Sequence, residues 1–185
     1  MRHFCLALGL GAVMALPAAA NTLRDTADRI AQMGTHAGAP IGLGEKLYRS
    51  TMTISDDCMM TGEQRSDIRA NPPSPALLRY TVPVAQINPD KVNTLAADNL
   101  LILSFSVPKG TKGHAVTMDI TKSNPMIGRA RDGIASGREQ GQCNTSGCRL
   151  DFNSGFVELA LVGKTKTEAR RLAADVKQLI ELCKK

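Results

Sequence analysis

The chain has 185 residues, a formal net charge of +6 at pH 7, and an aromatic content of only 3% with no tryptophan. So few aromatic side chains argue against the stacking surfaces that bind single-stranded nucleic acid. The hydrophobic core must therefore be built mainly from Leu, Ile, Val and Met.

The first twenty residues have the pattern of a secretory signal peptide. Arg2 and His3 give a basic start, residues 4–16 are almost wholly apolar, and three alanines precede a cleavage site after Ala20. Removing 20 of the 185 residues leaves 165 with a net charge of +5, because Arg2 is the only charged residue lost. We therefore expect one exported α+β domain over residues 21–185, periplasmic or secreted, with no membrane span.

In the first half of the mature chain, one helix is followed by extended segments. Thr22 is placed to cap a helix in which Leu23, Ala27 and Ile30 recur at helical spacing, and Gly34 is a natural stop. The later segments are expected, in order, as a connector over 36–44, a strand over 46–55, an extended piece over 58–68, a rigid proline-rich loop over 71–75, an edge strand over 77–84 and a short helix over 92–97.

The second half predicts strands and a closing helix. An apolar strand over 100–107 leads through the turn 108–113 to an alternating strand over 115–120. The Gly- and Arg-rich stretch 123–142 is expected to be a mobile loop, and 149–162 a hairpin. Thr165 and Glu168 match a capping box before a helix with Leu172, Val176, Leu179 and Cys183 on one face. The expected fold class is α+β, an antiparallel sheet or small sandwich with terminal helices covering one face.

Four cysteines remain after cleavage, which favours two disulfides in an exported chain. Three pairings are formally possible. The short loop makes Cys143 and Cys148 the easiest pair to close, and that leaves Cys58 to pair with Cys183. Zinc binding by Cys143 and Cys148 is disfavoured because no second ligand pair matches them.

Motifs for catalysis or cofactor binding are weak in this sequence. Lys164 follows a strand, but Glu158 stands where a phosphate-binding loop needs glycine. Ser154 lacks the first glycine of a nucleophile elbow. The methionines beside Cys58 favour core packing over a copper site. We therefore expect no catalytic residue, cofactor or metal.

Basic residues are the remaining candidates for function. They either form a solvated basic face or meet an anionic surface of the cell envelope. An exposed loop on a rigid sheet is a usual place for a binding site. The expected binding surface consists of Lys109, Lys112, Arg129, Arg131 and Arg138.

The layout resembles the invasion-associated locus B family over roughly residues 46–180. The matching segments are 58–64 (Cys-Met-Met-Thr-Gly-Glu-Gln), 101–110 with its Pro-Lys-Gly turn, 116–120, the cysteine turn 143–148, and strand 156–161 before helix 167–182. The early tryptophan and cysteine of the family are missing, the 123–142 loop is longer, and Cys183 is additional. The resemblance implies a non-enzymatic periplasmic or envelope domain and brings no catalytic residues.

We therefore expect an exported, disulfide-stabilised binding protein without enzymatic activity, whose partner is an envelope or secreted protein or an anionic envelope surface. Two other classes stay open: an inhibitor or immunity protein directed against an exported toxin or hydrolase, and a cell-envelope enzyme with a cleft that the sequence does not reveal. Nucleic acid is not an expected partner.

Overall fold

The computed structural model describes residues 22–41, 46–68, 76–97, 100–152, 155–161 and 164–185. The predicted signal peptide (1–20), the proline-rich loop (71–75) and Ser154 lie outside these residues. None of the helices in the described ranges is long and apolar enough to cross a membrane.

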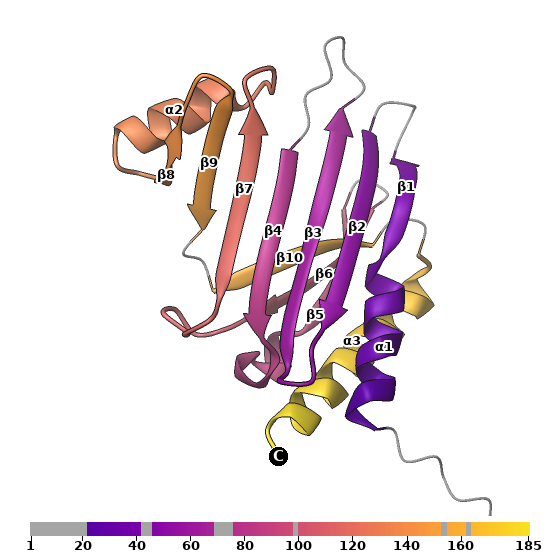
Figure 1. Cartoon of the computed structure of the whole chain (residues 1–185). Helices are drawn as coiled ribbons and strands as arrows, with labels where there is room; N and C mark the ends of the chain where they lie inside the picture. The colour runs from indigo at the N-terminus through magenta and orange to yellow at the C-terminus, as the bar shows by residue number, and fades with distance from the viewer. Residues whose placement is uncertain (1–21, 42–45, 69–75, 98–99, 153–154, 162–163) are drawn as a thin grey trace, which may run out of the picture.

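Two antiparallel sheets form the body of the molecule (Figure 1). The larger has seven strands, in the spatial order β1 (His36–Ile41), β2 (Lys46–Ile54), β3 (Met59–Ile68), β4 (Ala76–Pro83), β7 (Ala115–Thr121), β9 (Gly147–Phe152) and β8 (Gln140–Cys143). The smaller has three, in the order β10 (Phe156–Leu161), β6 (Leu100–Ser106) and β5 (Asn93–Ala97). The helices are α1 (Leu23–Gly34), α2 (Ile127–Ala135) and α3 (Lys166–Cys183). Together with two disulfides, this arrangement confirms the expected α+β class with antiparallel sheets and terminal helices.

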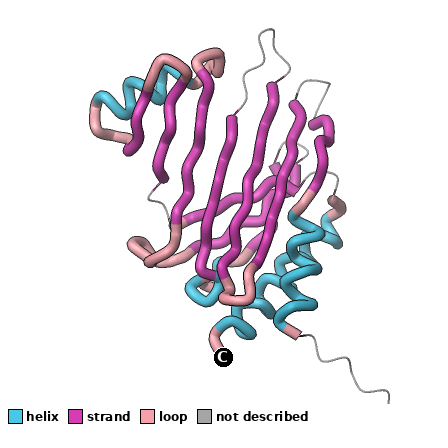
Figure 2. The backbone as a smooth tube through the Cα atoms, viewed as in Figure 1, coloured by secondary structure: helices cyan, strands magenta, loops and turns pink. Residues whose placement is uncertain are grey.

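The main core lies between the two sheets and α3. Strand alternation places Met60 and Val82 of the large sheet on its inner face, where both are fully buried. Leu103 and Phe105 of the small sheet and Leu179 of α3 complete the same apolar cluster. In Figure 2 the small sheet and the two long helices lie on one side of the seven-stranded sheet. The other face of the large sheet is therefore left to polar side chains.

A single buried carboxamide joins the two sheets. Gln64 of β3 donates from Nε2 to the carbonyl oxygen of Ala160 on β10, and its Oε1 accepts from the Ala160 N–H, both at 3.3 Å. Gln64 thus acts as a short piece of extra strand, which satisfies backbone groups on the outer edge of β10. Buried polar groups of this kind are costly when left unpaired, so the contact fixes the relative position of the sheets.

Both long helices start at the capping threonine that the sequence predicts, and the capping box predicted for α3 is confirmed. Thr22 and Asp25 form a capping box on α1, and Thr165 and Glu168 form one on α3. In α3, Leu172, Val176 and Leu179 are buried as expected from their spacing.

The two disulfides are those expected from the spacing of the cysteines. Cys58 and Cys183 are bonded across a sequence separation of 125 residues, with a Cα–Cα distance of 5.8 Å. Cys143 and Cys148 are directly opposite each other on β8 and β9. The long bond ties the start of β3 to the end of α3.

Three segments differ from the expected type. Residues 36–41 form β1 instead of a connector because β2 supplies a pairing edge, where Pro40 is tolerated. Residues 93–97 form β5 instead of a helix because β6 pairs with them. The expected loop over 123–142 contains α2 and β8. The sequence pattern did not indicate α2 because glycines and arginines surround its few buried positions.

Strands at expected positions also pair differently. β4 is not an edge strand but lies between β3 and β7, and Pro83 interrupts nothing because it is the last residue of β4. The expected hairpin over 149–162 is absent from the described residues: β9 pairs with β7 and β8, whereas β10 crosses to the small sheet and pairs with β6. Local sequence identified these strands but not their distant partners.

Candidate functional site

The five predicted binding cations are all exposed, but the fold divides them between two places. Lys109 and Lys112 lie in the turn before β7, whereas Arg129 and Arg131 lie on α2 and Arg138 follows it. The seven residues of β7 span about 23 Å. The turn cations and the α2 cations are thus at opposite ends of a strand and do not form one compact site.

The α2 end of this set belongs to a small projecting unit, which we call the α2 lobe and define as residues 120–150. Figure 1 shows it at one edge of the large sheet, away from α1 and α3. It has its own apolar cluster, in which Ala130 of α2 packs with Ile120, Cys148 and Leu150. The Cys143–Cys148 bond closes its hairpin. The lobe is therefore a rigid unit on the edge of the large sheet.

Local hydrogen bonds order the segments at both ends of α2. The side chain of Asn124 accepts from the Met126 N–H at 2.9 Å at the start of the helix. At its end, Gly137 takes a positive φ of 69°, a conformation that glycine adopts without steric cost and that commonly terminates helices. The Arg138 guanidinium then donates to the Ser136 hydroxyl at 2.9 Å. These contacts order the backbone segment that carries Arg129, Arg131 and Arg138.

The α2 lobe carries an excess of positive charge. Met126, at its N-terminal corner, is 52% exposed and adds an apolar contact point beside the charges. No ion pair of the described residues neutralises the cations on α2 itself. The lobe holds five cations (Lys122, Arg129, Arg131, Arg138 and Arg149) against two carboxylates (Asp132 and Glu139). Arg149 is paired with Asp151 on the open face of the sheet, so the other four cations leave a net charge of +2 on the α2 side.

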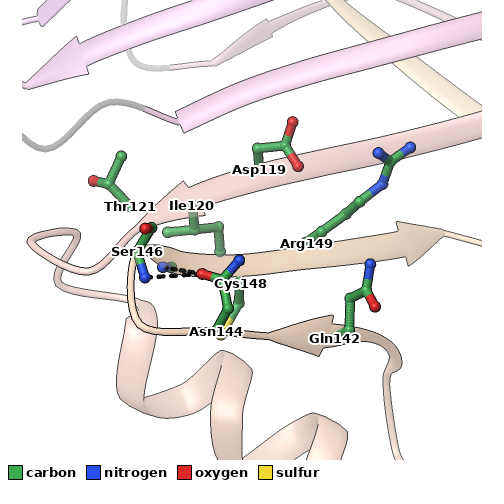
Figure 3. A pocket seen from close by; sticks show the side chains of 9 residues that line it. Asp119, Ile120, Thr121, Gln142, Asn144, Ser146, Cys148 and Arg149 are labelled. Atoms are coloured by element: carbon green, nitrogen blue, oxygen red, sulfur yellow. Dashed lines mark hydrogen bonds between the residues drawn. The ribbon is translucent and has the colours of Figure 1, made fainter.

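A shallow hollow of about 340 Å³ opens on the other side of the lobe, on the open face of the sheet (Figure 3). Asn144 shapes its rim, because its side-chain oxygen accepts from the N–H groups of Ser146 at 2.8 Å and Gly147 at 3.1 Å. Gly147 stands opposite Thr121, and a Cβ there would lie 2.0 Å from the Ile120 carbonyl oxygen. The missing side chain therefore both permits the strand pairing and leaves space above it.

Charges on this open face are paired with one another. Arg79 bridges Glu63 at 2.7 Å and Asp119, and the hydrogen bond that it donates to Glu63, followed by the one that it donates to Asp119, raises the pKa of Arg79 above its ordinary value. Arg149 lies 3.5 Å from Asp151. In Figure 3, Asp119 and Arg149 project to the same side from neighbouring strands. The hollow is thus nearly neutral, whereas the α2 side of the lobe is basic.

A second hollow of about 300 Å³ lies on the same open face, over β2, β3 and β4. Its walls carry hydroxyl groups, and the Thr53 and Thr61 oxygens are 2.8 Å apart. These groups hydrogen-bond rather than titrate. The open face therefore offers donors and acceptors on a flat support, with the Glu63–Arg79 pair at its centre.

The residues that the sequence offered as possible metal or phosphate sites have other roles in the fold. Met52 and Met60 are buried in the main core, as expected for packing residues, and Cys58 is held in its disulfide. Glu158 is exposed on β10. Within the described ranges, no group of three or more His, Cys, Asp or Glu side chains is placed to hold a metal ion.

Sequence reasoning missed the residues of the hollow. Asp119, Gln142 and Arg149 come from three strands, and only the pairing of β7 with β9 and of β9 with β8 brings them together. The alternation of Arg149 and Asp151 in the sequence was the one available signal that they share a face.

Comparison of the chain with protein-family models, with curated proteins and with solved structures found no match.

Proposed function

We propose that the protein is an exported, non-enzymatic binding protein and that the α2 lobe contacts an anionic partner in the cell envelope. The observation that carries the proposal is the net charge of +2 on the α2 side of a lobe with its own core and closed hairpin. Two disulfides are consistent with an exported protein in an oxidising compartment.

Positive charge of this kind acts on association in two ways. It attracts an anionic partner over roughly 8 Å at physiological ionic strength, and it increases the association rate more than the final affinity. Arg129 and Arg131 extend from an ordered helix, so little order has to be created on binding. Met126 adds apolar contact area that does not depend on charge.

The resemblance to the invasion-associated locus B family agrees with this proposal, since that family implies a non-enzymatic envelope domain. Membership of the family is itself a proposal. We also propose that the protein has no enzymatic activity, and assays of the mature protein on cell-wall polymers would test this directly.

The test is capture of partners from the envelope fraction of the source cell by the mature protein, with identification by mass spectrometry. The wild type is compared with two charge-reversal variants. One carries Arg129→Glu and Arg131→Glu in the lobe, and the other carries Lys109→Glu and Lys112→Glu in the turn before β7.

Because the two variants change net charge equally, they separate a local site from a general charge effect. We expect the lobe variant to lose the partner and the turn variant to keep it, with binding that weakens as salt is added. Equal retention or equal loss in both variants would contradict the proposal. A captured hydrolase or toxin that loses activity on binding would identify the protein as an inhibitor instead.

A further inference from the structure

A groove runs between the edge of the small sheet and helix α3. β5 is the last strand of its sheet in the described structure, and β6 pairs with only one of its two edges. α3 runs beside it, and two adjoining hollows of about 220 and 310 Å³ lie between them. Both are lined by Thr94 of β5 and Arg170 of α3, so they form one continuous groove.

Small side chains keep the floor of this groove open. Ala169, Ala173 and Ala174 are the residues of α3 that line it between the larger side chains. They leave the strand edge accessible, because none extends beyond Cβ. An edge that a protein merely protects is usually covered, bulged or very short. Here space is left beside it.

The side of the groove formed by α3 is basic. Lys166, Arg170 and Lys177 line it from one flank of α3, all three are exposed, and none takes part in an ion pair of the described residues. They extend over twelve residues of helix, or about 18 Å. The five residues of β5 extend over a similar length, about 17 Å. The row of cations thus runs beside the part of β5, Asn93 to Leu95, that lines the hollows.

The chemistry of the two sides of β5 also differs. Thr94 lines both hollows, whereas Leu95 lines only the first and, by strand alternation, directs its side chain to the other face of β5, where it is 48% exposed. An added strand with acidic residues at alternate positions would direct them toward α3. Its apolar residues would then lie beside Leu95.

We propose that this groove binds an extended acidic segment of a partner protein, which adds to β5 as a further strand. Main-chain hydrogen bonds to the edge supply affinity, and the three cations of α3 select carboxylate side chains. A second copy of this chain is a poorer occupant, because pairing of two β5 edges would bring two rows of cations together. The groove is separate from the α2 lobe, so its ligand is independent of the function proposed there.

The test uses the mature protein and fluorescein-labelled octapeptides, with binding followed by fluorescence anisotropy. In the acidic probe glutamate alternates with valine, and in the neutral probe glutamine replaces glutamate. A third probe is the acidic one with every main-chain nitrogen methylated, so that it cannot donate main-chain hydrogen bonds. We expect the acidic probe to bind at least about tenfold more tightly than either of the others.

Two neighbouring charge reversals provide matched variants. Arg170 lines both hollows, whereas Arg171 is also exposed but lines neither. We expect Arg170→Glu to weaken binding of the acidic probe by about tenfold or more, and Arg171→Glu to change it by less than about twofold. Circular dichroism verifies that both variants are folded, and bound probe should slow hydrogen exchange of the β5 amides.

Several results would overturn the proposal. These are equal binding of the acidic and glutamine probes, equal loss in the two variants, or no binding of the acidic probe at about 1 mM. Sedimentation velocity supplies the remaining comparison. A dimer that grows with protein concentration and is strengthened by Arg170→Glu would assign the groove to a second copy of the chain.

Discussion

Replacing Gln64 with leucine should destabilise the protein far more than the same change at an exposed strand position. The substitution keeps most of the side-chain volume but removes both hydrogen bonds to Ala160, each of 3.3 Å. Gln64 and Ala160 are each only 9% exposed, so water cannot easily replace the lost partner. Leaving two buried backbone groups unpaired costs about 1–3 kcal/mol each, and the extra apolar burial of leucine offsets part of this, for a net loss of about 2–4 kcal/mol.

The measurement is urea denaturation followed by far-ultraviolet circular dichroism at constant protein concentration. Gln140→Leu is the matched control, because Gln140 is an exposed glutamine on β8. It should change the free energy of unfolding by less than about 0.5 kcal/mol. Equal losses in the two leucine variants would refute the assigned role of Gln64.

A Gln64→Glu variant adds a test by pH. An ionised carboxylate accepts from the Ala160 N–H but cannot donate to the Ala160 carbonyl, and its charge is buried. A protonated carboxyl group does both. The stability deficit of this variant relative to wild type should therefore shrink as pH falls. A deficit that does not depend on pH would contradict the two-way hydrogen bonding.

The remaining predictions concern the disulfides, a histidine and a helix cap. Replacing Cys58 and Cys183 by alanine should cost about 5 kcal/mol for a separation of 125 residues, against about 2 kcal/mol for the hairpin disulfide with a separation of 5, measured by denaturation under non-reducing conditions. Burial, followed by the charge of a nearby lysine, lowers the pKa of His36. The His36 contribution to the free energy of unfolding should therefore be fully present above the ordinary histidine pKa of about 6.5 and should be lost at lower pH. His36→Gln should reduce this loss in a pH series. Thr165→Ala should cost roughly 1 kcal/mol at neutral pH. Because hydrogen bonds from Thr165 lower the pKa of Glu168, that cost should diminish as pH falls through the folded-state pKa, when the carboxylate is protonated.

Local signals predicted the parts of this fold that depend on local physics. Both capping boxes need only residues within one helical turn, so Thr22 and Thr165 could be identified directly. The burial of Val116 and Ile120 follows from alternation along one strand. β5 was mistaken for a helix because its short sequence, 93–97, has no strong preference of its own. Its state is decided by pairing with β6.

The candidate site was predictable only in part, for a related reason. Arg129, Arg131 and Arg138 are close in sequence and remain together on the α2 lobe. Lys109 and Lys112 were grouped with them because residues on both sides of a turn and strand can converge in space. β7 instead extends straight between the two sets, and its length keeps them apart. Only sheet topology contains that information.

The long disulfide also imposes an order on oxidation. A chain synthesised from its N-terminus presents Cys58 first, then the two cysteines of the β8–β9 hairpin, and Cys183 after them, 125 residues beyond Cys58. Before Cys183 is present, the native partner of Cys58 does not exist. Any early pairing of Cys58 with Cys143 or Cys148 has to be reversed by thiol–disulfide exchange before the native bond can form. Formation of the long disulfide therefore reports that synthesis has passed the last residue of α3.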